Sequence, residues 1–527
     1  MSILQIDLGK FGEVLLKQEK NTAATFIRLH SDDNVLVALR DLKKAESLPG
    51  LPDIQLITSI RQGHKFAARD IAKGEHVIRY GQIIGSALRD IRAGEHVHVQ
   101  NCGMDTHTQD YAFSSSSVAL APASETRTFN GFHRKDGRVG TRNYVGIITS
   151  VNCSGSVAKF IAQEAEKTDW FASLENVDGI VPITHSGGCG LGTDEEGYQT
   201  LFRTLTGYAQ HPNFAAILLL GLGCEVMQIP DLVGQHRLND SKLFDYMTIQ
   251  DTGGTAKSVE RGVSAIRDLA TQANACTRQP APVSKLVIGM QCGGSDGLSG
   301  ITANPALGVA SDLIVSQGGT TILSETTEIY GAEHLLTRRA ASREIGEALI
   351  ERIKWWEDYT ARNGSEMDNN PSPGNKRGGL TTILEKSLGA VAKSGTAPLT
   401  AVYKYAEPLA NRGFVFMDSP GYDPVAVTGQ VASGANLICF TTGRGSVSGY
   451  QPTPCIKVSS SDDLYSRMGE DMDANCGDVV SQGVSLDHKG HELFELFIAV
   501  ASGEKTKSES LGYGSVEFVP WHIGATV

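Results

Sequence analysis

Cysteines beside glycines stand out among the residues of this sequence that could carry chemistry. Four segments each place one cysteine in a glycine-containing loop just after an apolar run: Cys153, Cys189, Cys224 and Cys292. If the apolar runs are parallel strands, such loops meet at the carboxyl edge of a sheet, where ligands bind. Thiolates there suit iron, either as a single ion together with His185 or as a cluster. The alternative is an ordinary buried cysteine, which is common at strand ends.

Charged residues in similar positions suit a metal ion and a carboxylate ligand. Three acids end apolar runs and would suit a hard cation, although each also fits a helix N-cap or a turn: Asp296, Glu325 and Asp418. Three cations lie in glycine-rich or strand-edge segments, where they would clamp a carboxylate or simply be solvated: Arg142, Lys376 and Arg444. His64 lies in the N-terminal region, where a lone histidine is more often structural than catalytic.

Strands that alternate with helices must position these residues. From residue 143 onward, continuous apolar runs predict buried parallel strands at 144–150, 179–183, 215–220, 285–290, 320–324, 399–402, 414–417 and 437–440. Helical periodicity between them predicts an α/β fold with helices on both faces of the sheet. Residues 1–101 instead hold short apolar runs separated by glycines, which is typical of a small β domain. We expect a serine-rich linker at 102–128, a second boundary at 274–282 and no internal repeat.

Composition excludes several classes of function. The chain has 527 residues and a net charge of −12, which disfavours a nucleic-acid-binding surface because such a surface needs clustered Lys and Arg. The longest apolar run, 214–222, is about half of the ~20 residues needed to span a bilayer, and the N-terminus lacks the apolar core of a signal peptide. Nine scattered cysteines without a CxxC pair argue against a disulfide framework. We therefore expect a cytoplasmic protein without nucleic-acid or membrane partners.

The short motifs of common enzyme classes are mostly missing. The sequence contains neither GxxxxGK[ST] nor HExxH, and no clean GxGxxG followed by an acid about 20 positions later. An NAD-dependent oxidoreductase is weakened by this absence but stays an alternative. The segment 293–297 matches GxSxG, yet nothing marks a later histidine as the partner that a hydrolase would need.

Long motifs give a more specific indication. The segments GFHRKDGRVGTRN, GLGCE, QCGGSDGLSGITANP, NPSPGNKRGG and TTGRG resemble the altronate/galactarate dehydratase family, and they lie at 131–143, 221–225, 291–305, 370–379 and 441–445. The segments LHSDDNV, QGHKFA and GEHVHVQN are similar to the SAF-type β-clip domain that opens these enzymes, and they lie at 29–35, 62–67 and 94–101. The resemblance spans nearly the whole chain.

The resemblance implies both an architecture and an activity. It implies a SAF-like β-clip domain at 1–101, a linker at 102–128, an α/β middle domain that dimerises at 129–276, and a variant Rossmann-like domain with a parallel sheet and a metal site at 277–527. It also implies a homodimeric, iron-dependent hydro-lyase that removes water from a sugar acid. We expect D-altronate as substrate and 2-keto-3-deoxy-D-gluconate as product, with galactarate, which would give 5-keto-4-deoxy-glucarate, as the alternative. A non-catalytic sugar-acid-binding protein is an alternative of another class.

The resemblance also guides our hypotheses for the site. Elimination next to a carboxylate needs an enediolate to be stabilised, which a divalent cation does as a Lewis acid. We expect Fe(2+), with Mn or Ca as replacements and an iron–sulfur cluster still open, bound among His185, Cys189, Cys224, Cys292 and Asp296. We expect the substrate to be held by Arg142, Asn304, Asn375, Lys376 and Arg444. The catalytic residues are expected to be His64, His185 and Lys376.

Overall fold

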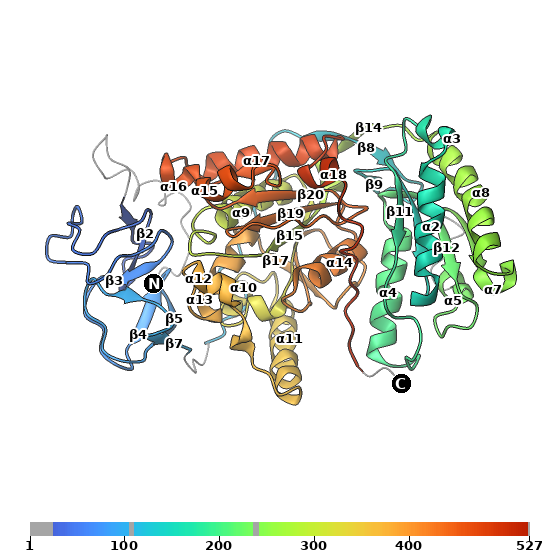
Figure 1. Ribbon diagram of the computed structural model, residues 1–527. Coiled ribbons are helices and arrows are strands. Elements are labelled where there is room, and N and C mark those ends of the chain that lie inside the picture. Colours follow the sequence, from blue (N-terminus) through green and yellow to red (C-terminus); the bar gives the residue numbers. More distant parts are fainter. Residues whose placement is uncertain (1–24, 105–109, 235–241, 525–527) are drawn as a thin grey trace.

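The computed structural model describes residues 25–104, 110–234 and 242–524, and it contains three sheet-based domains (Figure 1). Their order in space differs from their order in the chain, because the C-terminal domain lies between the N-terminal and the middle domain. The predicted α/β class with a small N-terminal β domain is confirmed. The expected N-terminal segment 1–24 and residues 105–109 of the expected linker lie outside the described residues. No helix in the described part of the chain is long and apolar enough to cross a membrane.

The N-terminal domain consists of two small antiparallel sheets. One has the order β1–β2–β3–β6 and the other the order β4–β5–β7. Their bounds are Phe26–Ile27 (β1), Val35–Ala38 (β2), Lys65–Ala67 (β3), His76–Arg79 (β4), Gln82–Ala87 (β5), His96–Val97 (β6) and Cys102–Gly103 (β7). The strands are short because turns interrupt them every few residues.

These turns include a motif that occurs three times, so the expectation of no internal repeat was wrong. In each copy an arginine Nη2 donates to the Oε1 atom of a glutamate six residues later, at 2.6, 2.6 and 2.5 Å, in the pairs Arg40–Glu46, Arg69–Glu75 and Arg89–Glu95. The other oxygen of each glutamate accepts from a backbone N–H three residues before it. The repeat is only seven residues long, but its copies RDLKKAE, RDIAKGE and RDIRAGE, at 40–46, 69–75 and 89–95, are similar enough for the sequence to show it.

The middle domain is a parallel sheet of order β11–β10–β12–β13 with helices on both faces. The strands are Tyr144–Thr149 (β10), Ile180–Ile183 (β11), Phe214–Gly221 (β12) and Leu243–Thr248 (β13). Because side chains alternate along a strand, Val145 and Ile147 pack with α2 (Gly155–Glu166) and α8 (Thr255–Ala273), whereas Tyr144 and Ile148 pack on the face of α4 (Glu196–Gln210). Helix α4 in turn packs on α14 (Asp423–Ser433) of the C-terminal domain, so the two domains share a core.

The C-terminal domain is an all-parallel sheet of seven strands in the order β17–β18–β16–β15–β19–β20–β21. Its strands are Val287–Cys292 (β15), Thr320–Leu323 (β16), Leu399–Tyr403 (β17), Gly413–Met417 (β18), Leu437–Thr442 (β19), Cys455–Ser459 (β20) and Ala474–Asn475 (β21). Helices α9 (Ala303–Ser316) and α17 (Leu486–Ala501) cover one face and α14 covers the other. All five strands expected in this region are present, because each is a mostly apolar run; four of them are buried almost throughout, and β17, at the edge of the sheet, is half-buried.

Short segments join the domains. Strands β8 (Thr128–His133), β9 (Val139–Gly140) and β14 (Gln279–Pro282) form a small sheet where the chain enters and leaves the middle domain. The described part of the expected linker lies along the C-terminal domain, where Ser114 and Ser116 donate backbone hydrogen bonds to the carbonyls of Thr337 and Arg338. This part of the chain is therefore docked on the C-terminal domain.

Candidate functional site

Three potential ligand atoms meet at the carboxyl edge of the seven-stranded sheet. Cys292 ends β15, Glu325 follows β16, and Glu328 closes the short helix η3 (Thr326–Glu328). One donor atom from each lies within 4.8 Å of the other two, and all three residues are buried. Glu325 has a φ of 70°, which is costly for a residue with a Cβ. Ser419 holds it there by accepting two hydrogen bonds, with Oγ from the backbone N–H of Glu325 and with its carbonyl from that of Thr326.

Two buried lysines contact this group. Lys393 Nζ donates to Cys292 Sγ at 2.9 Å, and Lys386 Nζ lies 2.5 Å from Glu328 Oε1. Burial alone would lower the pKa of both lysines, but the thiol of Cys292 beside Lys393 and the carboxylate of Glu328 beside Lys386 outweigh burial and raise it. Both lysines are therefore protonated, and they compensate the charge of the buried acids.

Several acceptors in this group have no partner in the described structure. They are both carboxylate oxygens of Glu325, Oε2 of Glu328 and Oε1 of Gln291. Burial, together with the nearby carboxylates of Glu328 and Asp423, raises the pKa of Glu325 well above its usual value. Burial likewise raises the pKa of Asp423 to about 6. Buried acceptors without partners are costly, and a set of them with shifted pKa values marks a functional site. We call Cys292, Glu325, Glu328, Lys386, Lys393 and Asp423 the Glu325 cluster.

The loop after β15 forms a rim beside the Glu325 cluster, and two of the predicted cations flank it. The Arg444 backbone N–H donates to the carbonyl of Gly294, and among the described residues its guanidinium has no partner. Asn375 Nδ2 donates to the carbonyl of Ser295, the next residue of the loop, and Asn375 is followed on α12 (Pro373–Arg377) by the half-buried Lys376. The structure thus places Lys376 and Arg444 around one loop, as a carboxylate-binding role requires.

Three other predicted residues build this rim from within the protein. Asp296 Oδ1 accepts four hydrogen bonds, from Leu298 N, from Ser299 N and Oγ, and from Ser460 Oγ. Asn304 donates to the carbonyl of Gly389 and accepts from Thr441 Oγ1. The Asn375 oxygen accepts from Ser372 at the start of α12. These side chains fix the loop and the helix, so we assign Asn304 and Asn375 a positioning task in place of the expected substrate contact.

The N-terminal domain packs against the same rim. A Cβ on Gly297 would lie 1.9 Å from the carbonyl oxygen of Gly63, so this contact is between backbones and requires glycine. His64 Nε2 donates to the carbonyl of Arg377 at 3.2 Å, which leaves Nδ1 to accept from His96 Nε2 at 3.0 Å. His98 completes a group of three rings, each 5.2–5.3 Å from the others. Burial lowers the pKa of all three, to about 4 for His96 and about 3 for His98, so they are neutral.

A buried ion-pair network fixes the two domains together. Glu385, on α13 (Ile383–Val391), lies 2.8 Å from Lys65 Nζ and 2.5 Å from Arg79 Nη1, and all three side chains are at most 1% exposed. Burial raises the pKa of Glu385, but the two cations outweigh burial and hold this pKa at about 2. His64 is therefore delivered to the rim by a rigid contact.

The five predicted metal ligands do not come together. His185, Cys189 and Cys224 lie at the carboxyl edge of the middle sheet, whereas Cys292 and Asp296 follow β15 in the other sheet. Among the described residues, Cys292, Glu325 and Glu328 are the one set of three such donors within 4.8 Å of each other. His185 is buried, its Nε2 donates to the carbonyl of Thr149 at 3.0 Å, and its Nδ1 accepts from Gly187 N, so neither nitrogen is free for catalysis or for a metal. Local spacing could not reveal that the two sheets present separate edges.

Arg142 also has a different task from the one expected. Its guanidinium makes a bidentate ion pair with Glu509, at 2.6 and 2.8 Å, and further hydrogen bonds to the carbonyls of Thr141, Val500 and Glu504. It is 2% exposed. Arg142 does clamp a carboxylate, but that of the protein's own C-terminal region.

Five residues of the site were not predicted from the sequence: Glu328, Lys386, Lys393, His96 and His98. One signal was present for the lysines: both lie in or just after an apolar helical stretch, Ile383–Val391, where a solvated charge is out of place. For the histidines, the alternating HVH of residues 96–98 places both rings on one face of a strand.

Comparison with known proteins gives a consistent result over nearly the whole chain. Family models match three successive parts: "Altronate/galactarate dehydratase SAF domain" at 24–105, "D-galactarate dehydratase/Altronate hydrolase, second domain" at 131–274, and "D-galactarate/Altronate dehydratase, C-terminal" at 283–526. An altronate dehydratase of Bacillus subtilis is 35% identical over 92% of this chain and 96% of its own length. A galactarate dehydratase (L-threo-forming) of Escherichia coli is 37% identical over 93% and 95%. The (2R)-sulfolactate sulfo-lyase subunit beta of Chromohalobacter salexigens is 31% identical over 73% and 96%.

Proposed function

The chain belongs to the altronate/galactarate dehydratase family and is a sugar-acid hydro-lyase; from this premise we propose that it dehydrates D-altronate to 2-keto-3-deoxy-D-gluconate at the Glu325 cluster. The main support for placing the active site at the Glu325 cluster is the buried carboxyl of Glu325. It has two oxygens without partners, a raised pKa and a protonated lysine within its cluster. Burying a carboxyl without hydrogen-bond partners costs folding free energy. Such groups cluster at functional sites, where the surrounding structure enforces them.

The reaction assigns a task to each group. The proton on C2, next to the substrate carboxylate, is only weakly acidic, so the base must have a raised pKa and a dry environment. Glu325 takes this proton, and the C3–O bond breaks as the hydroxyl leaves with a proton from Lys393, which gives water. The resulting enol gains a proton at C3 and loses the proton of its C2 hydroxyl to water, which gives the 2-keto product. Lys376 and Arg444 at the rim hold the substrate carboxylate.

His64, expected as an acid or base, is assigned a positioning role in this proposal. Its Nε2–H donates a hydrogen bond to the carbonyl of Arg377, and its Nδ1 accepts one from His96 Nε2. It therefore fixes the chain next to Lys376, from the opposite domain.

Iron, which the resemblance implies, fits the Glu325 cluster poorly. Cys292, Glu325 and Glu328 are suitable donors by type. However, the ammonium of Lys393 is hydrogen-bonded to the sulfur and that of Lys386 to a Glu328 oxygen, so two positive charges lie where a divalent cation would bind. We therefore route no step of the reaction through a metal at this position, and we keep Fe(2+) as a proposed cofactor whose ligands lie elsewhere.

Galactarate is the second candidate substrate, and a specific observation favours it. One loop is contacted by Asn375, which precedes Lys376, and by the backbone of Arg444, and two cations near one loop suit a sugar acid with a carboxylate at each end. Identity does not separate the two substrates, because the altronate and galactarate relatives are 34–37% identical to this chain.

A direct assay tests the proposal. Full-length protein, purified without oxygen and supplied with Fe(2+) and a reductant, is incubated with D-altronate or with galactarate, and the release of a 2-keto acid is followed. We expect kcat/KM for D-altronate to exceed that for galactarate at least tenfold. The reverse ratio would transfer the assignment to galactarate, and product from neither would refute both.

A further inference from the structure

The cysteines of this protein divide by exposure. Cys153, Cys189 and Cys224 are exposed, whereas Cys276 is partly buried and the other five are buried. An exposed free thiol is an oxidation liability, so three of them in one domain call for a function. We call these three residues the cysteine edge.

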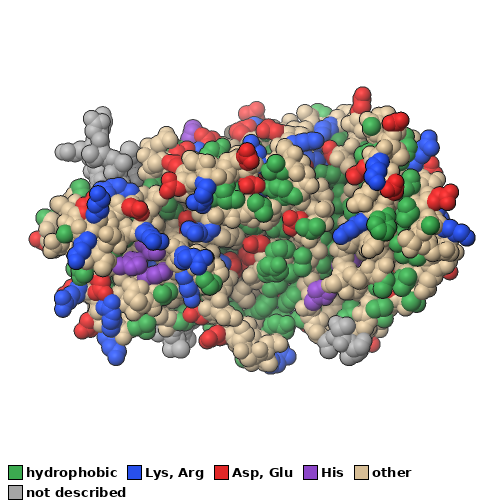
Figure 2. Space-filling view, viewed as in Figure 1, with side chains coloured by type: hydrophobic (Ala, Val, Ile, Leu, Met, Phe, Trp, Pro, Cys, Tyr) green, Lys and Arg blue, Asp and Glu red, His purple; other side chains and the backbone are tan. Residues whose placement is uncertain are grey.

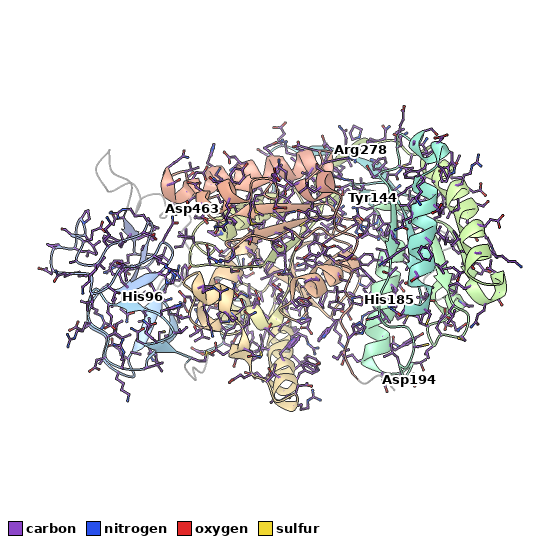
Figure 3. All side chains as sticks on the ribbon, in the orientation of Figure 1. His96, Tyr144, His185, Asp194, Arg278 and Asp463 are labelled. Atoms are coloured by element: carbon purple, nitrogen blue, oxygen red, sulfur yellow. The ribbon has the colours of Figure 1, made fainter. Side chains whose placement is uncertain are left out.

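The cysteine edge lies at one end of one sheet. Cys153 follows β10, Cys189 follows β11 and Cys224 follows β12, and these three strands are neighbours in the parallel sheet of the middle domain. In Figure 3, His185, which comes just after the end of β11, lies below Tyr144, the first residue of β10, and so marks the carboxyl edge of the sheet. The carboxyl edge of a parallel sheet is where such folds bind ligands.

Hydrogen bonds tie the three loops together next to the cysteines. Beside Cys153, Asn152 N donates to the carbonyl of Gly187 at 3.0 Å. Beside Cys189, the carbonyl of Gly188 accepts from Met227 N at 3.2 Å. Beside Cys224, Glu225 Oε1 accepts from Ser150 Oγ at 2.5 Å. Each cysteine is thus one residue away from a hydrogen bond to a neighbouring loop, so the three cysteine-bearing loops lie side by side.

The backbones of these loops pack closely against one another. Gly188 has a φ of 104°, and a Cβ there would lie 2.3 Å from the carbonyl oxygen of Ser150. His185, buried and hydrogen-bonded at both nitrogens, fixes the start of the Cys189 loop. Gln250 Nε2 donates to Cys224 Sγ at 3.4 Å, the kind of hydrogen bond to sulfur that tunes a metal–thiolate site.

The spacing of the thiols favours a cluster over a single ion. The three sulfur atoms are not all within 4.8 Å of each other, since Cys292, Glu325 and Glu328 form the one such set in the described part of the chain. Thiolates that share one ion must lie close together, whereas thiolates that bind separate irons of a cluster stand further apart.

We propose that Cys153, Cys189 and Cys224 bind a [4Fe–4S] cluster through three of its irons. The fourth iron then has no cysteine from this edge and is open to small oxygen ligands such as water, a hydroxyl or a carboxylate. The cluster rests on the cysteine edge alone and does not depend on the proposed function, which places dehydration at the Glu325 cluster. Figure 2 shows the face of the molecule hollowed between the N-terminal and middle domains, with acidic side chains inside the hollow, and histidine side chains are visible on both sides of it.

The test uses full-length protein purified without oxygen and reconstituted with Fe(2+) and sulfide. We expect about four irons and four acid-labile sulfides per chain, visible charge-transfer absorption, and an electron paramagnetic resonance signal on reduction. Cys153→Ser, Cys189→Ser and Cys224→Ser should each lower sulfide content and absorption at least fivefold. Cys276→Ser, a cysteine of the same domain region outside the edge, should keep both.

Two further readouts separate the possible failures. Because the three side chains are exposed, the serine variants should match the thermal unfolding midpoint of the cluster-free wild type, which excludes loss of the cluster through misfolding. Glu325→Gln should lose dehydration but keep the full cluster, so failure of the proposed function and failure of this inference give different results. Wild-type protein without labile sulfide, iron bound at one ion per chain, or serine variants with undiminished absorption would each overturn the cluster.

Discussion

Among single residues, Glu325 is held in place at a high energetic cost. It combines a φ of 70° with two buried carboxylate oxygens that have no partner in the described structure. Each feature costs on the order of 1–3 kcal/mol. Glu325 therefore lowers the stability of the fold, and its proposed role as the catalytic base explains why the protein retains it.

The pH dependence of dehydration should report this carboxyl. Burial and the carboxylates of Glu328 and Asp423 raise the pKa of Glu325, while Lys386 and Lys393 oppose them. The base must be ionised, so kcat should fall as pH decreases, with a midpoint above the ordinary glutamate value of 4.5.

Asp423→Asn provides the matching variant. It removes one neighbouring negative charge, so the acid limb of the kcat profile should move to lower pH. A midpoint at or below 4.5 in the wild type, or a profile that Asp423→Asn leaves in place, would contradict the assignment of the base.

Individual residues were also the hardest to predict from sequence. Glu325 was recognisable as an acid at a strand end, and Lys376 and Arg444 as cations in glycine-rich segments. Lys393 was not, because its partner Cys292 is 101 residues away in the chain and no local pattern links them. Arg142 was expected to bind the substrate, because an arginine in this position suits a carboxylate. The residue type does not say which carboxylate is bound, and here it is that of Glu509.

At the scale of elements, the strands were predictable and the contacts between domains were not. Buried parallel strands are continuous apolar runs, so β10, β15 and β19 could be located within about two residues. The docking of the N-terminal domain rests instead on Lys65 of β3, Arg79 of β4 and Glu385 of α13, which come from three separate parts of the chain. Their pairing is a property of the folded arrangement alone.

This docking network predicts a specific loss of stability in acid. The pKa of Glu385 is about 2 in the folded protein, below its usual 4.5, so its contribution is fully present above pH 4.5 and is lost as pH falls through about 2. Glu385→Gln leaves two buried cations without their partner and should cost about 3–5 kcal/mol at neutral pH. Glu75→Gln, which breaks the exposed pair with Arg69, should cost about 0–1 kcal/mol.

Urea unfolding of both variants between pH 2 and pH 7 measures these effects. The difference between wild type and Glu385→Gln should shrink as pH falls below 4.5. Equal stability of the two proteins at pH 7 would show that the domains are held together by other contacts.

At the scale of the whole molecule, the chain places its last domain between the other two (Figure 1). Arg142, at the start of the middle domain, and Glu509, near the C-terminus, fasten this arrangement with a buried bidentate pair. The motif at 131–143 thus stabilises the assembly of domains, whereas the sequence reading had placed it in the site.

Arg142→Met should therefore destabilise the protein without a specific effect on chemistry. We expect a loss of about 3–5 kcal/mol because Glu509 is left without its partner. Arg138→Met, in the same motif but 43% exposed and paired with Asp136, should cost about 0–1 kcal/mol. Urea unfolding measures the loss, and kcat measured below the unfolding transition should stay within twofold of wild type. A KM for D-altronate raised tenfold or more at unchanged stability would return Arg142 to the substrate site.

The most direct test of the central claim compares wild type, Glu325→Gln and Glu351→Gln for release of keto acid from D-altronate. Glu351 lies on α11 (Arg343–Arg362) with its side chain 75% exposed, so its replacement controls for the loss of a glutamate as such. The account predicts that Glu325→Gln lowers kcat at least a thousandfold while the fold is retained, and that Glu351→Gln matches wild type. Wild-type turnover by a folded Glu325→Gln would show that dehydration takes place elsewhere.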